Sequence, residues 1–280
     1  MTQRDIQQRF IFEHAPVRGE IVHLQDAYQK IIGQQEYPPM VKHLLGEALV
    51  SCLLMASSIK FEGMLALQFQ GDASLPLLIV QADHHLNIRA CATFQEGLGD
   101  DVYSQSFLHG NMTVNINQNN QTNPYQSVIP IQSTSMAENL MQYFAQSEQL
   151  STQIWLAVND TQASGMMLQL MPTDSDADRE EFWQYAVQIG GTITPHELWT
   201  LDNTELLHRL YHETELRLFE PRPTQFKCRC SQEKMRQVLM TLGKEDAEAL
   251  IAERGSIEVV CDFCHQEYQL DVIDVAMIFS

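Results

Sequence analysis

The sequence predicts an α+β protein with three parts: a large N-terminal sheet-plus-helix domain, a helical acidic linker and a small C-terminal zinc-binding domain. Within residues 1–172, strand-like runs and helices do not alternate regularly enough for a doubly wound sheet. Acidic residues dominate residues 173–224, and residues 225–280 contain four of the chain's 6 cysteines in two close pairs. A length of 280 residues suits one large domain and a smaller one.

The N-terminal domain is predicted to form around one long apolar helix. Short elements precede it: strands at Phe10–Phe12 and Val17–Leu24, and a helix at Tyr28–Ile32. Pro38-Pro39 then open a helix that continues to about Ser58, with apolar positions recurring every three and four residues. Because this helix is apolar around much of its girth, we expect it to be covered on more than one side.

Seven further runs are predicted strands, and their alternation indicates a sheet with one buried face. They are Met64–Gln70, Leu77–Gln81, Ile88–Phe94, Met112–Ile116, Tyr125–Ile131, Ile154–Val158 and Met166–Met171. The polar stretch Asn115–Asn123 is predicted to be a loop, and Asn159–Gly165 joins the last two strands. Ser135 and Glu138 have the spacing of a capping box for a helix that runs to about Ser147.

The composition changes after Pro172. Residues 174–220 carry eleven acidic side chains against three basic ones. Helical signals persist, since Thr194-Pro195-His196-Glu197 combines a cap, a first-turn proline and a capping glutamate, and Asp202–Tyr211 places its leucines on one face. Leu216–Leu218 alternates like a short strand. This segment has little core of its own, so it must lie against another surface, and its acidic repulsion should make that docking marginal.

The C-terminal domain is predicted to be a compact unit of helices and one hairpin. Ser231 caps a helix that ends at Gly243. The remaining elements follow in order: a helix at Glu245–Glu253, strands at Ile257–Val260 and Tyr268–Leu270, and a short helix within Asp271–Phe279. Cys261 and Cys264 then lie at the tip of the hairpin, as in a zinc knuckle.

Two close cysteine pairs, Cys228/Cys230 and Cys261/Cys264, have the spacing of a four-thiolate zinc site. A domain this small has too little core for secure stability, and such domains usually need a metal or disulfides. Zinc binding coupled to folding supplies about 10–16 kcal/mol. We therefore predict one Zn²⁺ per chain in the reduced form, with these four cysteines as its ligands.

Three uses of this pattern remain open. A thioredoxin-type redox Cys-x-x-Cys should open a helix, whereas Gln266–Leu270 reads as a returning strand. A four-ligand zinc is usually only a structural staple. As a switch, zinc would tie the two pairs together across thirty residues. If an oxidant converted each close pair to a disulfide, two short rings would replace that crosslink, and the domain and the linker beside it should loosen.

The other candidate residues carry weaker signals. They are Cys52 and Cys91, expected as buried core thiols; His265, a possible substitute ligand; the pair His208 and His212, four residues apart on one helix face; and His84-His85, expected in a turn. The sequence has no nucleophile elbow, phosphate loop or dinucleotide fingerprint. We therefore expect no catalytic residues and no enzyme activity.

The charge and the apolar runs bear on partners and location. With 17 basic against 36 acidic residues the net charge is −19, so we expect neither nucleic acid nor an anionic membrane as a partner.

The longest apolar run, Ala48–Ile59, is shorter than the roughly twenty residues of a membrane span. Met1–Gln8 has no apolar signal region. We expect a cytoplasmic protein whose thiols are kept reduced.

Nine stretches spread along the chain carry a family resemblance, and the two around the cysteines are the most specific. They are Phe12-Glu13, Val17–Glu20, Lys60–Gly63, Leu67–Asp72, Tyr143–Leu150, Gly165–Pro172, Arg209–Glu213, Phe226–Ser231 and Val260–Cys264. In these stretches the chain resembles the 33 kDa chaperonin family of bacterial redox-regulated heat-shock chaperones. One departure is Ala163-Ser164-Gly165, where that family tends to have paired glycines, and we expect a stiffer turn there.

The resemblance implies an ATP-independent holdase that is inactive when reduced and zinc-bound. In such proteins peroxide or hypochlorite, usually with heat, forms disulfides, which here would be Cys228–Cys230 and Cys261–Cys264. Zinc release and unfolding of the linker follow. The linker and the nearby surface of the first domain then bind unfolding client proteins, oxidised molecules tend to dimerise, and clients later pass to ATP-driven chaperones. The alternative is a zinc-stapled adaptor that binds a folded partner through residues 1–172, in which case oxidation is only damaging.

Overall fold

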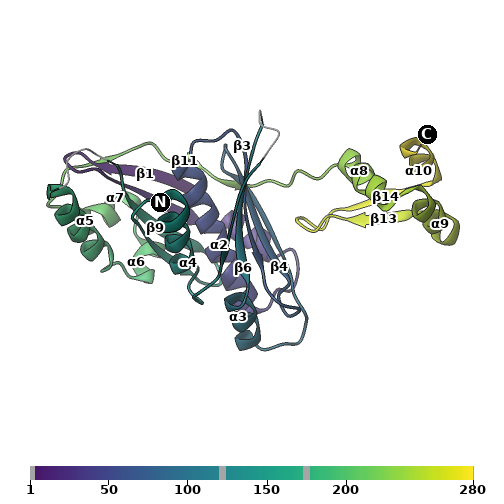
Figure 1. Cartoon of the computed structure of the whole chain (residues 1–280), viewed down its shortest axis with the longest axis horizontal. Helices are drawn as coiled ribbons and strands as arrows, with labels where there is room; N and C mark the ends of the chain where they lie inside the picture. Colours follow the sequence, from purple (N-terminus) through teal and green to yellow (C-terminus); the bar gives the residue numbers. More distant parts are fainter. Residues whose placement is uncertain (1–3, 120–123, 173–176, 280) are drawn as a thin grey trace. The chain divides into compact units, whose positions relative to one another are not determined.

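The structure is a computed structural model of the 280-residue chain, and it describes residues 4–119, 124–172 and 177–279. The chain divides into an N-terminal unit, Met1–Phe226, and a C-terminal unit, Lys227–Ser280 (Figure 1). Helices and strands are mixed as predicted, so the α+β fold class is confirmed.

The N-terminal unit contains two six-stranded sheets. The strands of the first sheet are β1 (Ile6–Phe12), β2 (Val17–Leu24), β8 (Thr152–Val158), β9 (Ala163–Leu170), β10 (Leu216–Leu218) and β11 (Arg222–Pro223). Those of the second are β3 (Gly63–Gln70), β4 (Leu77–Asp83), β5 (Asn87–Thr93), β6 (Asn111–Gln118), β7 (Tyr125–Pro130) and β12 (Gln225–Phe226). The order is β10-β1-β2-β9-β8 in the first sheet, with β11 also on β1, and β12-β5-β4-β3-β6-β7 in the second.

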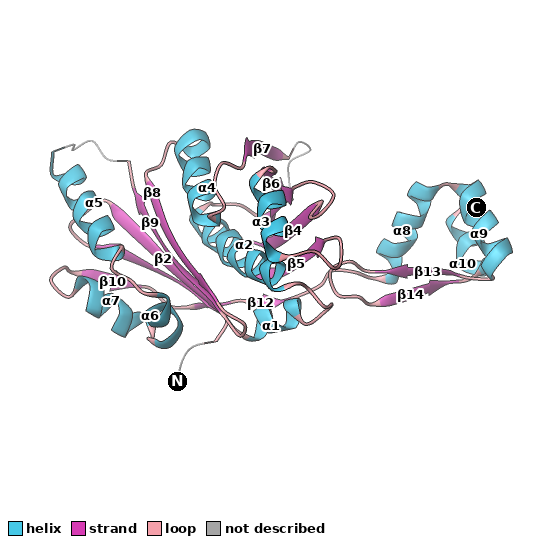
Figure 2. Ribbon diagram, turned by 90° about the horizontal axis from the view of Figure 1, so that it is seen from below, coloured by secondary structure: helices cyan, strands magenta, loops and turns pink. Residues whose placement is uncertain are grey.

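One long helix lies between these sheets (Figure 2). The helices of the unit are α1 (Asp26–Ile32), α2 (Pro39–Ser58), α3 (Asp100–Leu108), α4 (Met136–Tyr143), α5 (Ala177–Gly190), α6 (Pro195–Thr200) and α7 (Asn203–Tyr211). Helix α2 contacts β2, β8 and β9 on one side and β3, β4 and β5 on the other. By length and composition it could cross a membrane, but 78% of its apolar window is buried inside the protein. The prediction that it is covered on more than one side is confirmed.

The structure corrects several predicted boundaries. Asn115–Gln118 belongs to β6 and is not part of a loop, because Val114 and Ile116 alternate into the core. Residues 120–123 of that predicted loop lie outside the described residues. Residues 163–165 belong to β9, so the departure expected to stiffen a turn lies in a strand that pairs with β2 and β8.

Two further differences concern helices. Helix α3 was not predicted, because its short run offers only Tyr103 and Phe107 as a buried apolar repeat. The helix after Ser135 is α-helical only to Tyr143 and continues as a π-helical turn, η1 (Phe144–Glu148). The Ser135 side chain caps this helix by accepting from the backbone N–H of Glu138, but the predicted capping box is incomplete, because the Ser135 N–H donates to Ser133 Oγ and not to Glu138.

Residues 177–218, here called the docked segment, pack on the first sheet. The predicted capping box at Thr194 and Glu197 is confirmed, and Asp202 caps α7. Apolar side chains of these helices meet the outer face of the sheet in a second core formed by Phe10, Phe12, Val17, Ile21, Met166, Leu168, Leu170, Trp183, Ala186, Leu198, Leu206, Leu207, Leu210 and Tyr211. The acidic segment therefore has a defined docking surface, and its role as a linker stays a prediction.

A buried polar network fixes helix α7 to this sheet. The Asn203 amide donates to Gln8 Oε1 at 2.8 Å, and its Oδ1 lies 2.7 Å from His23 Nε2. Gln8 in turn donates to the carbonyl of Phe219 at 2.7 Å, beyond the end of β10. Burial lowers the pKa of His23, so the neutral ring is favoured in this position. One side chain, Asn203, thus satisfies groups on two strands of the sheet.

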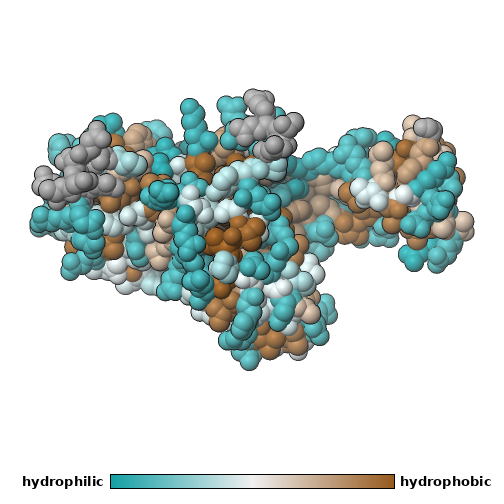
Figure 3. Space-filling model, in the orientation of Figure 1, coloured by the Kyte–Doolittle hydropathy of each residue, from teal (hydrophilic) through white to brown (hydrophobic). Residues whose placement is uncertain are grey.

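The C-terminal unit contains the predicted elements. They are α8 (Gln232–Leu242), α9 (Lys244–Arg254), β13 (Ile257–Val260), β14 (Glu267–Leu270) and α10 (Val272–Ile278). Its buried core consists of Leu239, Ala247, Ile257, Leu270 and Val275. Several large apolar side chains remain exposed, among them Ile273 and Met277, and the face visible in Figure 3 mixes hydrophobic with hydrophilic residues. So small a core needs additional stabilisation.

The substitution Asn203→Ala should loosen the docked segment. It leaves Gln8 Oε1 and the His23 ring unsatisfied, and each buried unpaired group costs about 1–3 kcal/mol. We expect the free energy of opening for α5–α7, measured by amide hydrogen exchange, to fall by about 2–4 kcal/mol. The exposed neighbour Thr204→Ala serves as the control, and equal protection in the two variants would contradict the role of the network.

Candidate metal centre

The β13–β14 hairpin positions two of the four cysteines. The Cys261 N–H donates to the carbonyl of Gln266 at 3.0 Å, and the N–H groups of Cys264 and His265 donate back to the Cys261 carbonyl at 3.3 and 2.8 Å. His265 has a φ of 52°, in the left-handed region, which lets the chain reverse into β14. The tight turn therefore presents Cys261 and Cys264 to the same side, as predicted for a zinc knuckle.

The other two cysteines come from the extended stretch between β12 and α8. Cys228 and Cys230 are two residues apart, and the next residue, Ser231, begins α8 by accepting from the N–H of Lys234 at 3.3 Å. In an extended chain, residues i and i+2 point to the same side. Both thiols are thus directed toward the hairpin turn by local geometry that the sequence specifies.

The four thiols form one cluster. All their Sγ atoms lie within 4.8 Å of one another. Cys228 and Cys261 are 3.7 Å apart, and Cys230 and Cys264 are 3.3 Å apart. A tetrahedral site with metal–sulfur bonds near 2.3 Å requires sulfur separations of about 3.8 Å. The cluster therefore fits a metal ion bound by four thiolates, and the donor set is the one that structural zinc prefers.

A tyrosine supports this cluster. The hydroxyl of Tyr268 on β14 donates to Cys230 Sγ at 3.0 Å, and this bond raises the pKa of Tyr268 to about 12. Tyr268 was not predicted as a site residue, because its role depends on the hairpin register that pairs it with Val259. Groups that hydrogen-bond to metal ligands orient them and adjust their basicity.

The thiols differ in acidity. Burial opposes ionisation of Cys228, but hydrogen bonds from the Cys230 backbone and from the neighbouring thiols outweigh it and lower the pKa of Cys228 to about 7. Burial raises the pKa of Cys261 and of Cys264. Cys228 is therefore the thiol among these three that ionises most readily, and the thiolate is the form that binds metals and attacks oxidants.

The remaining candidates lie outside the cluster. His265 is exposed and does not join the four sulfur atoms. Cys52 and Cys91 are buried core thiols, as predicted. His208 and His212 are exposed with ring centroids 5.9 Å apart, and no third ligand accompanies them among the residues that the structure describes. His84-His85 lies in the turn between β4 and β5. Sequence reasoning thus identified the cluster correctly.

Comparison with known proteins agrees with the family resemblance seen in the sequence, over nearly the whole chain. The model of the Hsp33 protein family matches residues 5–271. The chain belongs to the Hsp33 family. Its membership confirms the family resemblance predicted from the nine stretches and identifies the chain as a chaperone of this family.

Relatives in the Hsp33 family align from end to end. The 33 kDa chaperonin of Nitrosococcus oceani is 37% identical over 280 residues, covering 100% of this chain and 96% of that protein. The 33 kDa chaperonin of Pseudomonas aeruginosa is 39% identical over 286 residues, again with 100% and 96% coverage. The crystal structure of the 33 kDa chaperonin from Thermotoga maritima superposes with a TM-score of 0.84 over 98% of this chain and 97% of that one, at 20% identity. This similarity shows the shared fold.

The reduced protein should bind one Zn²⁺ per chain through this cluster. We expect Cys261→Ser to weaken binding by more than about 100-fold, because a ligand is lost, and Tyr268→Phe to weaken it by about tenfold. Competition with a chromophoric chelator measures both affinities. Cys52→Ala, which removes a thiol outside the cluster, should bind as the unmodified chain does, and equal loss in all three variants would contradict the assignment.

Proposed function

We propose that this chain is a redox-regulated, ATP-independent holdase that is inactive with its four thiols reduced and holding zinc. The observation that carries the proposal is the combination of a four-thiol cluster with a small hydrophobic core, five buried residues and the partly buried ones around them, in the C-terminal unit. A metal that joins Cys228/Cys230 to Cys261/Cys264 then supplies much of this unit's stability. Whatever removes the metal also unfolds the unit.

Oxidation is the proposed trigger. Two thiols and one hydrogen peroxide yield one disulfide and two water molecules, so two equivalents of peroxide convert the four thiols to two disulfides. Because the sulfur atoms of a disulfide are no longer thiolates, they cannot hold the metal, and zinc is released. Cys228 is the proposed first nucleophile, because its pKa of about 7 makes it the thiol most readily ionised near neutral pH among the three whose pKa is shifted.

The expected disulfides are Cys228–Cys230 and Cys261–Cys264. Each closes a ring of three or four residues and restrains the unfolded chain little, whereas cross-pairs such as Cys228–Cys261 would keep the long-range link that zinc provides. The cross-pairs lie at 3.7 and 3.3 Å, so proximity alone does not choose the local pairs. The local pairs are therefore the ones whose formation loosens the domain.

Release of the docked segment would create the client-binding surface. Its departure uncovers apolar residues on the outer face of the first sheet, among them Phe12, Ile21 and Met166, and the segment carries its own leucines into solvent. Unfolding proteins expose apolar surface that both would bind. The high negative charge of the segment, which opposes docking, also keeps such a complex soluble.

The remaining features of the proposal follow from this cycle. Exposed apolar surface would also allow two oxidised molecules to dimerise. No nucleotide is needed to hold a client, so clients would be transferred to ATP-driven chaperones for refolding. A switch that must be reduced before stress belongs in the cytoplasm, where thiols are kept reduced. Nucleic acid and membranes are not among the proposed partners.

Peroxide at elevated temperature should convert the reduced protein into a holdase. We expect suppression of the thermal aggregation of a test protein to rise by about an order of magnitude, together with zinc release and loss of amide protection in 177–218. The control sample receives heat without peroxide. Equal activity in the reduced zinc form would overturn the switch, and zinc release without loss of protection in 177–218 would overturn its coupling to the segment.

Peptide mapping of the oxidised protein tests the disulfides separately. In a digest that cleaves after glutamate, Cys228 and Cys230 stay on one peptide and Cys261 and Cys264 on another, and we expect each of these peptides to be internally linked. Peptides linked between the two pairs would contradict the proposed loosening. A zinc-stapled adaptor, by contrast, would lose its partner on oxidation and gain no holdase activity.

A further inference from the structure

A cavity of about 350 Å³ in the N-terminal unit collects positive charge in an otherwise acidic protein. Four of the chain's 17 Lys and Arg side chains line it: Arg9, Arg18, Lys60 and Arg222. His84 and Phe61 also line the cavity, and no carboxylate is among the lining residues that the structure describes. The redox cycle proposed above uses none of these side chains. We call this cavity the basic pocket.

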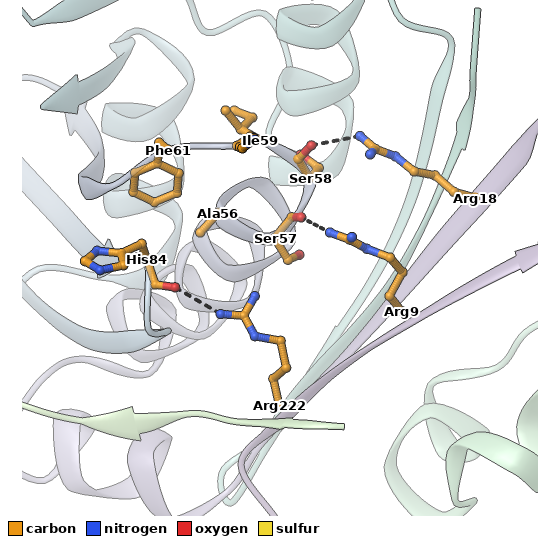
Figure 4. Close-up of a pocket in the computed structure, with 10 residues that line it drawn as sticks. Arg9, Arg18, Ala56, Ser57, Ser58, Ile59, Phe61, His84 and Arg222 are labelled. Atoms are coloured by element: carbon orange, nitrogen blue, oxygen red, sulfur yellow. Dashed lines mark hydrogen bonds between the residues drawn. The ribbon is translucent and has the colours of Figure 1, made fainter. Parts of the chain in front are cut away.

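The four cations come from separate parts of the fold. Arg9 lies on β1, Arg18 on β2 and Arg222 on β11, and His84 lies in the turn after β4 (Figure 4). Lys60 follows the C-terminus of α2. Residues this distant in sequence meet here only because both sheets converge at the end of α2. The sequence alone therefore offered no signal for the basic pocket.

Hydrogen bonds hold the guanidinium groups in place. Arg9 Nη2 donates to the carbonyl of Ser57, and Arg18 Nη2 donates to that of Ser58 at 2.9 Å (Figure 4). Arg222 Nη2 donates to the carbonyl of His84 at 2.9 Å. These acceptors are neutral, so the bonds orient the cations without neutralising them. The bond to His84 uses one of the five N–H donors of Arg222, whereas Arg18 also donates from Nε and Nη2 to Gln169 Oε1 at 3.1 and 2.7 Å.

The nearby negative charge is small. Glu20 is fully buried and accepts from Arg9 at 3.3 Å and from Gln7 at 2.9 Å. Burial raises the pKa of Glu20 to about 7 despite Arg9 and Arg18, so the carboxylate is only partly ionised at neutral pH. The carboxylate in contact with these cations is thus the partly ionised Glu20, to which the end of α2 adds a partial negative charge.

A purely structural role explains only part of this arrangement. Arginines that bond the last carbonyls of a helix stabilise its C-terminus, which accounts for Arg9 and Arg18. It does not account for Lys60, which has no ion-pair partner among the described residues, or for Arg222, which bonds a carbonyl outside the helix. The positive charges of Lys60 and Arg222 therefore line the cavity without a structural role that explains them.

We propose that the basic pocket binds a small phosphate-bearing anion. Guanidinium groups recognise phosphate oxygens through paired N–H donors, and a lysine adds a mobile positive charge. The volume exceeds that of a single phosphate group, and Phe61 and the aliphatic end of α2 provide an apolar wall for the rest of the molecule. Pyrophosphate is the simplest probe of suitable charge.

Binding would also affect the chaperone cycle, an extension that rests on the proposed function. Strand β11 carries Arg222 and pairs with β1 just after the docked segment. A ligand that contacts Arg222 binds only when β11 is in place, so it stabilises the docked state by mass action. We therefore expect the anion to oppose release of the segment and to raise the threshold for activation.

Titration of the reduced protein tests the site itself. We expect pyrophosphate to bind saturably at one site per chain, with a Kd below about 1 mM, by calorimetry at constant ionic strength. Lys60→Gln and Arg222→Gln should each weaken binding by about tenfold. Arg4→Gln, the same charge change at an exposed position outside the pocket, should have no effect. Arg9 and Arg18 are left unchanged, because they support the end of α2.

Each outcome tests one part of the proposal: the site, its preference for phosphate or its coupling to the docked segment. No saturable binding, or equal weakening by Arg4→Gln, would overturn the site. Binding of sulfate as tight as that of pyrophosphate would overturn the preference for phosphate. Slower loss of amide protection in 177–218 with pyrophosphate during peroxide treatment would support the coupling, and an unchanged rate would overturn it. Because the titration uses no client and no oxidant, its result stands whether or not the holdase function holds.

Discussion

The thinness of the C-terminal core is the constraint on which the proposed behaviour of this protein depends. A cluster of five buried residues is a small core for Lys227–Ser280, and four thiols placed within 4.8 Å of one another would provide a crosslink if they bind a metal. Stability that comes from thiolate–metal bonds differs from stability that comes from packing, because an oxidant removes it without heat. In the proposed cycle, a redox signal thereby becomes a change in folding.

In the proposed cycle, unfolding of the C-terminal unit would affect the first sheet and the docked segment that covers it. It is apolar on both faces: Val22 and Met167 face the core around α2, whereas Ile21, Met166 and Leu168 face the docked segment. A strand buried on both faces needs a cover on each side, and the docked segment covers the outer one. The cover is acidic and is held by the polar network at Asn203, by the pairing of β10 with β1, by the Arg217–Glu13 ion pair and by its apolar side chains. In the proposed cycle, the surface beneath it is exposed when these contacts are lost.

Local patterns predicted most of the individual elements. The capping box at Thr194, the proline-initiated α2 and the knuckle at Cys261–Cys264 depend on neighbours within a few residues, and all three are present. Helix α3 and strands β11 and β12 were missed, because two-residue strands and a short helix have no periodicity to read. The loop predicted at Asn115–Gln118 was wrong because polar side chains on one face of β6 concealed its buried partners.

The sequence by itself predicted the four-thiol cluster, since one hairpin turn and one short extended stretch each direct two of the thiols to one side, and it predicted that α2 must be covered on more than one side. The tertiary structure alone decided which surfaces meet. It paired Asn203 with Gln8 and His23, placed Tyr268 beside Cys230, and gathered Arg9, Arg18 and Arg222 around one cavity. The physical reason is range: caps and turns depend on neighbours in the chain, whereas a pocket between strands depends on register and packing that no local pattern encodes.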